Sequence, residues 1–258
     1  MLFLLSPAKT LDYLTPAADL PHTRPVFAAQ SARLIQELRE KSPQEIAGLM
    51  DLSDVLAALN VARYQAWSTR FTAKNSKQAV LAFDGDVYDG LQARSLAPED
   101  LQWAQDHLCI LSGLYGVLRP LDWMQPYRLE MGTSLAVGET GNLYQFWGSQ
   151  LARYLNQRLA ADKTPVVINL ASVEYAKAVD RKTLKARVID CAFEDWKSGS
   201  YKIISFSAKK ARGMMARYAV THRVDTPSKL EGFDSGGYAF APASSEPHRL
   251  VFRRKIDT

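Results

Sequence analysis

Residues 165–177 read Pro-Val-Val-Ile-Asn-Leu-Ala-Ser-Val-Glu-Tyr-Ala-Lys, and this stretch indicates the fold class of the chain. Its first five residues form a short β-branched run that is typical of a buried strand. Ser172 is then a candidate cap for a short helix that carries Glu174, Tyr175 and Lys177. Polar groups at the carboxyl end of a strand usually mark the ligand crevice of an α/β sheet, although helix capping and strand-end hydrogen bonds explain them equally well.

The rest of the chain alternates between strand-like and helix-like segments, which predicts a mixed α/β fold. No linker, repeat or low-complexity segment divides the chain, so we expect one domain over residues 1–258 with interleaved helices and strands. Two pairs of β-rich runs predict hairpins, and the sheet should therefore combine parallel with antiparallel pairing. The expected strands cover residues 1–5, 79–83, 165–169, 187–193, 201–206, 237–240 and 250–253.

Capping residues indicate where helices begin. Ser42-Pro43-Gln44-Glu45 is a capping box with proline at the first helical position, and Ser53 is a candidate cap for a helix that runs to Trp67. A third helix is expected to begin at Pro98 and a fourth to be capped by Ser207. The apolar residues expected on one face of the second helix are Val55, Leu56, Leu59 and Ala62.

Composition excludes several classes of protein. With 258 residues, 47% of them hydrophobic and 23% charged, the chain resembles an ordinary globular protein. The opening Met-Leu-Phe-Leu-Leu run lacks a basic flank and is too short for a signal peptide, and no run approaches the roughly 18 apolar residues of a membrane span. Cys109, Cys191 and the four histidines show no metal-ligand spacing. We therefore expect a cytoplasmic protein without a metal site, a cofactor or a membrane partner.

Residues 177–223 carry the positive charge of the chain. This window holds twelve Lys or Arg and four Asp or Glu, a surplus of eight, whereas the whole chain has a net charge of +5. On the helix expected after Ser207, the four basic side chains fall within an arc of about 160°. Phosphate binding and a solvated helix face both explain this arrangement. The four side chains are Lys209, Lys210, Arg212 and Arg217.

Residues 111–116 read Leu-Ser-Gly-Leu-Tyr-Gly and follow the helix predicted from Pro98. Glycines in such a hairpin let backbone amides approach a phosphate, so a helix-hairpin-helix-like element near residues 98–125 is one hypothesis. Gly113 and Gly116 are separated by two residues rather than the usual one, and Pro120 restricts a second helix. A simple helix C-cap at Gly113 is the alternative.

Acidic and basic side chains also lie in three predicted loops or extended segments. Asp86 and Tyr88 lie between two glycines after an expected strand, where they could act in a site or stabilise a turn. Arg128 and Glu130 share one face of an extended segment and could form a surface ion pair or flank a cleft. Lys9 follows the first strand, where it could meet an anion or simply be solvated.

Eight blocks in one order give the chain a resemblance to a known family. From Met1 to about Arg254 it resembles the peroxide stress resistance protein YaaA family, which is widespread in bacteria. The blocks are Ser6-Pro-Ala-Lys-Thr10, Gly85-Asp-Val-Tyr88, Leu111-Ser-Gly-Leu-Tyr-Gly116 with Leu118-Arg-Pro-Leu-Asp122, Pro126-Tyr-Arg-Leu-Glu-Met-Gly132, Leu143-Tyr-Gln-Phe-Trp-Gly148, Ile168-Asn-Leu-Ala-Ser172, Ser207-Ala-Lys-Lys-Ala-Arg-Gly213 and Gly232-Phe-Asp-Ser-Gly-Gly-Tyr238.

The resemblance implies a cytoplasmic protein of unusual α/β fold that binds DNA through a basic cleft and limits oxidative damage. Asp84 departs from the basic residue expected before Gly85, and Ser207 stands where an aromatic residue is common, so no DNA contact is assigned at Asp84. Carried over by position, the DNA-binding residues are Lys9, Gly113, Gly116, Arg119, Arg128, Lys177, Lys209, Lys210 and Arg212.

The sequence leaves two main hypotheses about function, and the concentration of charge weakens a third, a scaffold without a ligand. The first is a monomeric protein that binds double-stranded or branched DNA without sequence preference and protects the cell against hydrogen peroxide. The second is a metal-dependent or acid-base enzyme that acts on DNA or a nucleotide in the same cleft, because carboxylates repel phosphate and a pure DNA binder does not need them. Its catalytic residues would be Asp86, Tyr88 and Glu130, within a cleft that also holds Asn169 and Lys210.

Overall fold

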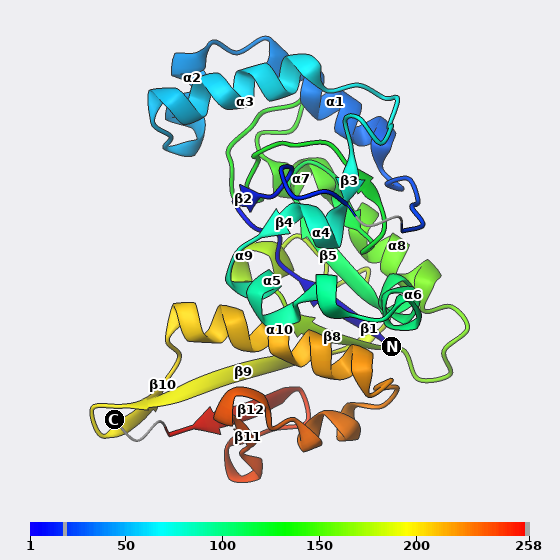
Figure 1. The fold of residues 1–258 in the computed structure, drawn as a ribbon, viewed down its shortest axis with the longest axis vertical. Coiled ribbons are helices and arrows are strands. Elements are labelled where there is room, and N and C mark those ends of the chain that lie inside the picture. The colour runs from blue at the N-terminus through cyan, green and yellow to red at the C-terminus, as the bar shows by residue number, and fades with distance from the viewer. Residues whose placement is uncertain (18–19, 256–258) are drawn as a thin grey trace.

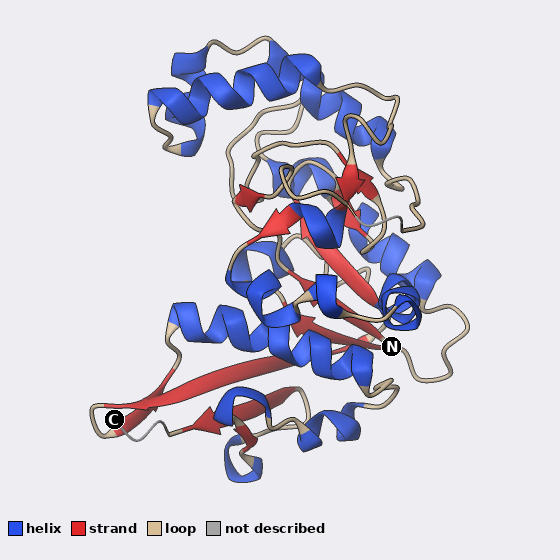
Figure 2. Cartoon of the chain, in the orientation of Figure 1, coloured by secondary structure: helices blue, strands red, loops and turns tan. Residues whose placement is uncertain are grey.

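An eight-stranded sheet with parallel inner strands organises the structure (Figures 1 and 2). The computed structural model describes residues 1–17 and 20–255. Strands β12, β9, β8, β1 and β5 pair in parallel, whereas β6, β10 and β11 add antiparallel edges. The mixed α/β fold predicted from the sequence is therefore confirmed. In order, the sheet contains β11 (Ala239–Phe240), β12 (Arg249–Arg254), β9 (Arg187–Lys197), β8 (Val166–Leu170), β1 (Leu2–Leu5), β5 (Leu108–Ser112) and β6 (Gly116–Leu118), with β10 (Ser200–Lys202) on β9.

Helices and two small ribbons surround this sheet. Helix α10 lies along one face, where it contacts β9, β1 and β8 (Figure 1). The ribbons pair β2 (Thr10–Leu11) with β4 (Phe83–Asp84) and β3 (Lys77–Gln78) with β7 (Trp123–Met124). The helices are α1 (Ala28–Arg39), α2 (Pro43–Met50), α3 (Asp54–Ala66), α4 (Ala79–Ala82), α5 (Asp86–Leu91), α6 (Pro98–His107), α7 (Leu143–Trp147), α8 (Gln150–Arg158), α9 (Val173–Ala176) and α10 (Ser205–Thr221), with 3₁₀ turns η1 (Ala93–Ser95), η2 (Pro227–Gly232), η3 (Ser235–Gly237) and η4 (Pro242–Ser244).

The connections of β1 and β8 diverge at the carboxyl edge of the sheet. Both strands are almost wholly buried and pair in parallel, so their carboxyl ends lie side by side. From β1 the chain passes to β5 on one side, and from β8 it passes to β9 on the other side. Such a reversal leaves a crevice between the two strand ends, which is the usual ligand position in open α/β sheets. The fold therefore places this crevice beyond Leu5 and Leu170.

Helices α5 and α10 cross at two glycines, and this close crossing divides the basic side chains of α10. An added Cβ at Gly213 would overlap the carbonyl oxygen of Val87, and one at Gly90 would overlap that of Lys210. Viewed down the axis of α10, Gly213 projects between Lys209 and Lys210. Because α5 packs on Gly213, it separates these two lysines. Consequently the predicted basic arc is split between two sides of α5.

Several helix and strand boundaries are confirmed by the structure. Ser42 and Glu45 form the capping box of α2, and Ser53 caps α3, which ends beside Trp67. The predicted strands at 1–5 and 165–169 correspond to β1 and β8. Both predicted hairpins form, as β9 with β10 and β11 with β12. The second strand of the first hairpin is shorter than expected because α10 already begins at Ser205.

Other local predictions were wrong. Residues 79–82 form helix α4 rather than a strand, because a short apolar run that is buried on every side satisfies either structure. The expected loop at 85–90 contains helix α5. Ser207 lies inside α10 and is not its cap. The α3 stripe of Val55, Leu56 and Leu59 is exposed, and Ala57, Asn60 and Tyr64 form the buried face instead.

The helix-hairpin-helix-like element predicted near residues 98–125 is also corrected. Helix α6 forms as expected, but β5 and β6 follow it as an antiparallel pair, so there is no second helix after the glycines. Both glycines are buried: Gly113 packs against the backbone of Leu129, and an added Cβ at Gly116 would lie 2.7 Å from the Trp147 ring. The sequence Gly-Leu-Tyr-Gly is thus a β-turn between buried strands, where the missing side chains permit tight packing.

The α5–α10 crossing predicts an asymmetry between two helical glycines. Gly213→Ala should lower the free energy of unfolding by about 2 kcal/mol, because overlap with a backbone carbonyl outweighs the better helix propensity of alanine. Gly48→Ala in α2, where an added Cβ meets nothing within 4 Å, should instead raise it by about 0.5–1 kcal/mol. Urea unfolding of both variants measures the difference. A Gly213→Ala protein as stable as the wild type would contradict this crossing.

Candidate functional site

A cavity of about 440 Å³ opens at the carboxyl edge of the sheet, in the crevice between β1 and β8. The backbone N–H of Ser172 donates a hydrogen bond to Ser6 Oγ at 2.8 Å and joins the loops that follow these two strands. Distant parts of the chain meet here because the parallel strands all end at this edge. The lining comes from residues 6–10 after β1, 84–87 around the start of α5, 127–130 after β7, residues 172, 174 and 175 after β8, and Lys209 and Arg212 of α10.

Four basic side chains predicted from the sequence line this cavity: Lys9, Arg128, Lys209 and Arg212. Lys9 Nζ lies 2.7 Å from one carboxylate oxygen of Glu130, and Arg128 Nη2 lies 3.2 Å from the other. Lys209 Nζ is 4.0 Å from a carboxylate oxygen of Asp86. The lysines are half to two-thirds exposed, whereas Arg128 is largely buried.

The two arginines have unused hydrogen-bond donors. The Nε atoms of Arg128 and Arg212 are buried and have no hydrogen-bond partner among the described residues. No described carboxylate lies within ion-pair distance of Arg212, and burial lowers the pKa of its guanidinium. An arginine still remains charged at neutral pH. A buried donor without an acceptor costs free energy, so an anion that supplied the acceptor would be stabilised here.

Four carboxylates line the same cavity: Asp84, Asp86, Glu130 and Glu174. Their number equals that of the cations, so the lining is formally neutral although it is strongly charged. Glu130 is held between Lys9 and Arg128, and Glu174 accepts a hydrogen bond from the Gly132 N–H at 2.9 Å. The acids thus partly position the cations and the backbone of the cavity.

Buried aromatic side chains form the apolar part of the cavity wall. The Tyr127 hydroxyl shares a 2.6 Å hydrogen bond with Ser112 Oγ, and Tyr127 and Tyr175 are both almost fully buried. Burial raises the pKa of both phenols, so they remain neutral. Pro7 and Leu129 line the cavity beside these two rings, next to the charged groups.

The remaining predicted DNA-binding residues lie outside the cavity. Lys177 follows α9 and lies over the Tyr144 ring, with Nζ 4.9 Å from the ring centroid. Lys210 lies beyond α5, where it lines two neighbouring hollows. Arg119 follows β6, which runs antiparallel to β5 and so ends at the opposite edge of the sheet, and it pairs with Asp122.

The candidate enzyme residues are only partly brought together. Asp86 and Glu130 line the cavity, as the sequence predicted for a cleft with acids. Tyr88 instead donates to the Ser6 carbonyl at 3.1 Å and lines a hollow on the far side of α5, and burial raises its pKa. Asn169 donates to Asp190 at 2.7 Å and accepts from the Ala171 N–H. Tyr88 and Asn169 therefore support the strand ends rather than line the cavity.

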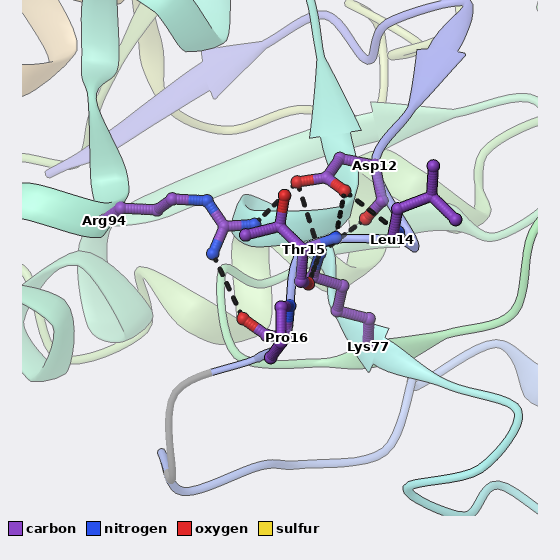
Figure 3. A network of polar contacts seen from close by, with 6 residues as sticks. All are labelled: Asp12, Leu14, Thr15, Pro16, Lys77 and Arg94. Atoms are coloured by element: carbon purple, nitrogen blue, oxygen red, sulfur yellow. Dashed lines mark hydrogen bonds and ion pairs between the residues drawn. The ribbon is translucent and has the colours of Figure 1, made fainter.

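A polar network centred on Asp12 fixes the chain after the Lys9 loop, and sequence reasoning missed it (Figure 3). One oxygen of the Asp12 carboxylate accepts from the N–H groups of Leu14 and Thr15 at 3.1 and 2.9 Å. The other lies 2.7 Å from Arg94 and 3.5 Å from Lys77. The Thr15 N–H above all, with help from the two cations, holds the pKa of Asp12 well below its usual range. An Asp three residues after Lys9, which itself follows the first strand, was the only sequence signal.

Sequence comparison identifies the family. The family model described as peroxide stress protein YaaA matches residues 1–244. The chain belongs to this family. Proteins named UPF0246 protein are similar over nearly the whole length: that of Polaromonas sp. strain JS666 is 68% identical over 255 residues, 99% of both chains, and that of Albidiferax ferrireducens is 66% identical over 255 residues, 99% of this chain and 98% of its own. The Paracidovorax citrulli relative is 68% identical over 256 residues, 99% of each chain.

Family membership confirms the resemblance read from the eight sequence blocks, and it is consistent with a role in peroxide protection. Within residues 1–17 and 20–255, no helix is both long and apolar enough to cross a membrane. In the same part of the chain, no group of three or more His, Cys, Asp or Glu side chains is arranged to hold a metal ion.

The Asp12 network predicts a pH-dependent contribution to stability. Asp12→Asn should lower the free energy of unfolding at pH 7, because the wild-type carboxylate is stabilised in the folded state. The lowered folded pKa means that this contribution is complete above the unfolded pKa of about 3.9 and declines as the pH falls below it. Urea unfolding at pH 7 and pH 3 should therefore show the gap between variant and wild type narrowing. Asp106→Asn, at an exposed carboxyl on α6, is the control; an equal gap at both pH values would contradict the prediction.

Proposed function

We propose that the chain binds DNA without sequence preference, through its carboxyl-edge surface, as part of peroxide defence. This surface consists of Lys9, Arg128, Lys177, Lys209 and Arg212. The observation that carries the proposal is the pair of arginines whose buried Nε donors have no acceptor within the described part of the chain, because a phosphate oxygen is an acceptor that suits a guanidinium. The role in peroxide defence rests on the family.

Exposed lysines around the arginines would supply most of the affinity. Lys9, Lys177 and Lys209 are exposed at the same edge of the molecule and could neutralise successive phosphates. The buried glycines Gly113 and Gly116 are not part of this proposal, and neither is Arg119 at the opposite edge. Counterion release from the DNA would make binding strongly dependent on salt.

The proposal predicts a steep salt dependence that is specific to the carboxyl-edge surface. If about four to six phosphates are neutralised, log K against log salt should have a slope of about −4 to −5 for duplex DNA. Lys209→Ala with Arg212→Ala should weaken binding more than tenfold and flatten the slope. Fluorescence anisotropy over a salt series measures both quantities.

A matched control separates a binding surface from bulk charge. Lys74→Ala with Lys163→Ala also removes two positive charges, from exposed lysines for which no ion pair with another described residue is found. Lys163 precedes β8 at the amino edge of the sheet, away from the cavity. This control pair should change the affinity less than twofold to threefold. Equal losses of DNA affinity in the two double variants, with circular dichroism spectra unchanged, would contradict binding through the proposed surface.

An acid-base enzyme acting on DNA or a nucleotide is the second candidate, because Asp86 and Glu130 line the same cavity as the two arginines with unused Nε donors. If the acids only hold the cations in position, no catalytic role is needed to explain their presence. Glu130 already fits that supporting role, since both of its oxygens contact cations. Among the described residues, the one ion-pair partner of Asp86 is Lys209 at 4.0 Å, so Asp86 is the less constrained of the two acids.

Neutralising the acids distinguishes the two candidates. Asp86→Asn and Glu130→Gln should leave duplex affinity unchanged or raise it, because less negative charge then faces the phosphates. Wild type and variants are incubated with plasmid, branched DNA and nucleotides, with and without Mg²⁺, Mn²⁺ or Fe²⁺, and the products are separated. A product formed by the wild type and lost in both variants would establish the enzyme instead.

A further inference from the structure

We infer that the cavity is a pocket for one nucleoside monophosphate unit, either free or as an unstacked nucleotide of a DNA strand. The second source rests on the proposed DNA binding. A volume of about 440 Å³ lies within the usual range of small-molecule sites. A duplex cannot enter such a cavity, whereas one nucleotide taken out of its base stack can. The cavity lies at the point where the connections of β1 and β8 diverge, the position at which α/β sheets bind nucleotides.

The phosphate would lie between the two arginines. Arg128 uses Nη2 for Glu130 and leaves its buried Nε unused, and Arg212 leaves its Nε unused without any carboxylate in ion-pair range among the described residues. A phosphate has several acceptor oxygens and can take both donors at once. Further phosphates would meet the four carboxylates of the lining, and they would be repelled. The pocket should therefore prefer a monophosphate to a triphosphate.

The base would lie against the aromatic wall of the cavity. Tyr127 and Tyr175 stay neutral and line the cavity together with Pro7 and Leu129, so these residues form its apolar side. Every base has a flat face that can stack on such a surface. The carboxylates of Asp84, Asp86 and Glu174 can accept hydrogen bonds from the amino and ring N–H groups of a base. In this arrangement the arginines bind the phosphate and the acids bind the base. Phosphate binding alone would give the acids no such function.

A strand that enters the pocket would continue along the start of α10. Phe206 is 65% exposed and lies one helical turn before Lys209, so the two side chains share a face of α10. An exposed ring beside an exposed lysine is the arrangement on which proteins stack the bases of a single strand while a cation contacts the phosphate. Phe206 is not among the residues that line the cavity, so we expect a strand that continues beyond the cavity to contact it and a free nucleotide not to.

Two binding measurements test the pocket. Calorimetric titration compares the four nucleoside 5′-monophosphates with inorganic phosphate, with the nucleosides and with one triphosphate. We expect at least one monophosphate to bind about tenfold or more tightly than phosphate or its own nucleoside, and more tightly than its triphosphate. Arg212→Gln and, as a more exposed second variant, Lys209→Gln should weaken that binding, by about tenfold or more for Arg212→Gln. Lys163→Gln should not change it.

The second measurement distinguishes the two sources of the nucleotide. Phe206→Ala should weaken single-stranded DNA binding severalfold and leave free monophosphate binding unchanged. If duplex DNA binds with a steep salt slope but no monophosphate binds or competes, the pocket inference is overturned and the proposed function stands. If a monophosphate binds but no DNA does, the proposed function fails and the pocket holds a free nucleotide. If inorganic phosphate binds as tightly as the monophosphates, the base-binding part of the inference is overturned. If neither DNA nor a monophosphate binds, both the proposed function and the pocket inference are overturned.

Discussion

The parallel pairing of β1 with β8 is the constraint on which the site depends. Leu2–Leu5 lies in register with Val167–Leu170, and nearly all of these residues are buried, so the two strands cannot shift without exposing apolar side chains. Their ends are therefore fixed side by side, and the Ser6–Ser172 hydrogen bond connects the loops that follow. Since the chain leaves these strands in opposite directions, the space between the loops stays open. The charged side chains of the cavity all line this opening.

Charge in a sequence window is a poor measure of charge at a site. The surplus of eight in residues 177–223 is divided by the fold, because α5 packs on Gly213 and separates Lys209 and Arg212 from Lys210 and Arg217. Arg217 donates to backbone carbonyls at the end of α5 and is thereby used in packing. At the cavity itself, cations and carboxylates are equal in number. A neutral lining with separated charges suits a ligand that has both an anionic group and hydrogen-bond donors better than it suits a bare polyanion.

The sequence predicted the class of fold and much of the cavity, because both follow from local rules. A buried strand that ends in polar residues predicts the crevice, and Lys9, Arg128 and Glu130 indeed meet there with the basic helix. The errors arose where tertiary contacts decide. Residues 79–82 are buried on all sides, so strand and helix bury them equally well. Gly113 and Gly116, the glycines of the predicted helix-hairpin-helix-like element, instead allow close packing of Leu129 and Trp147. A local sequence motif does not reveal these tertiary contacts.

The arrangement of the charged groups bears on whether this edge of the sheet binds a ligand, because Arg128 and Arg212 each keep a buried Nε donor without a partner among the described residues. An ion pair between Arg212 and a nearby carboxylate would relieve the cost of burying its guanidinium, and four carboxylates are present in the same cavity. Instead, Glu130 is held by Lys9 and Arg128, and Glu174 is bound to the Gly132 backbone. Neither of these two acids accepts a hydrogen bond from the unused Nε donors of Arg128 and Arg212. Such a separation costs free energy in the unliganded protein and would favour an anion that supplied the missing acceptors, which supports the proposed binding surface.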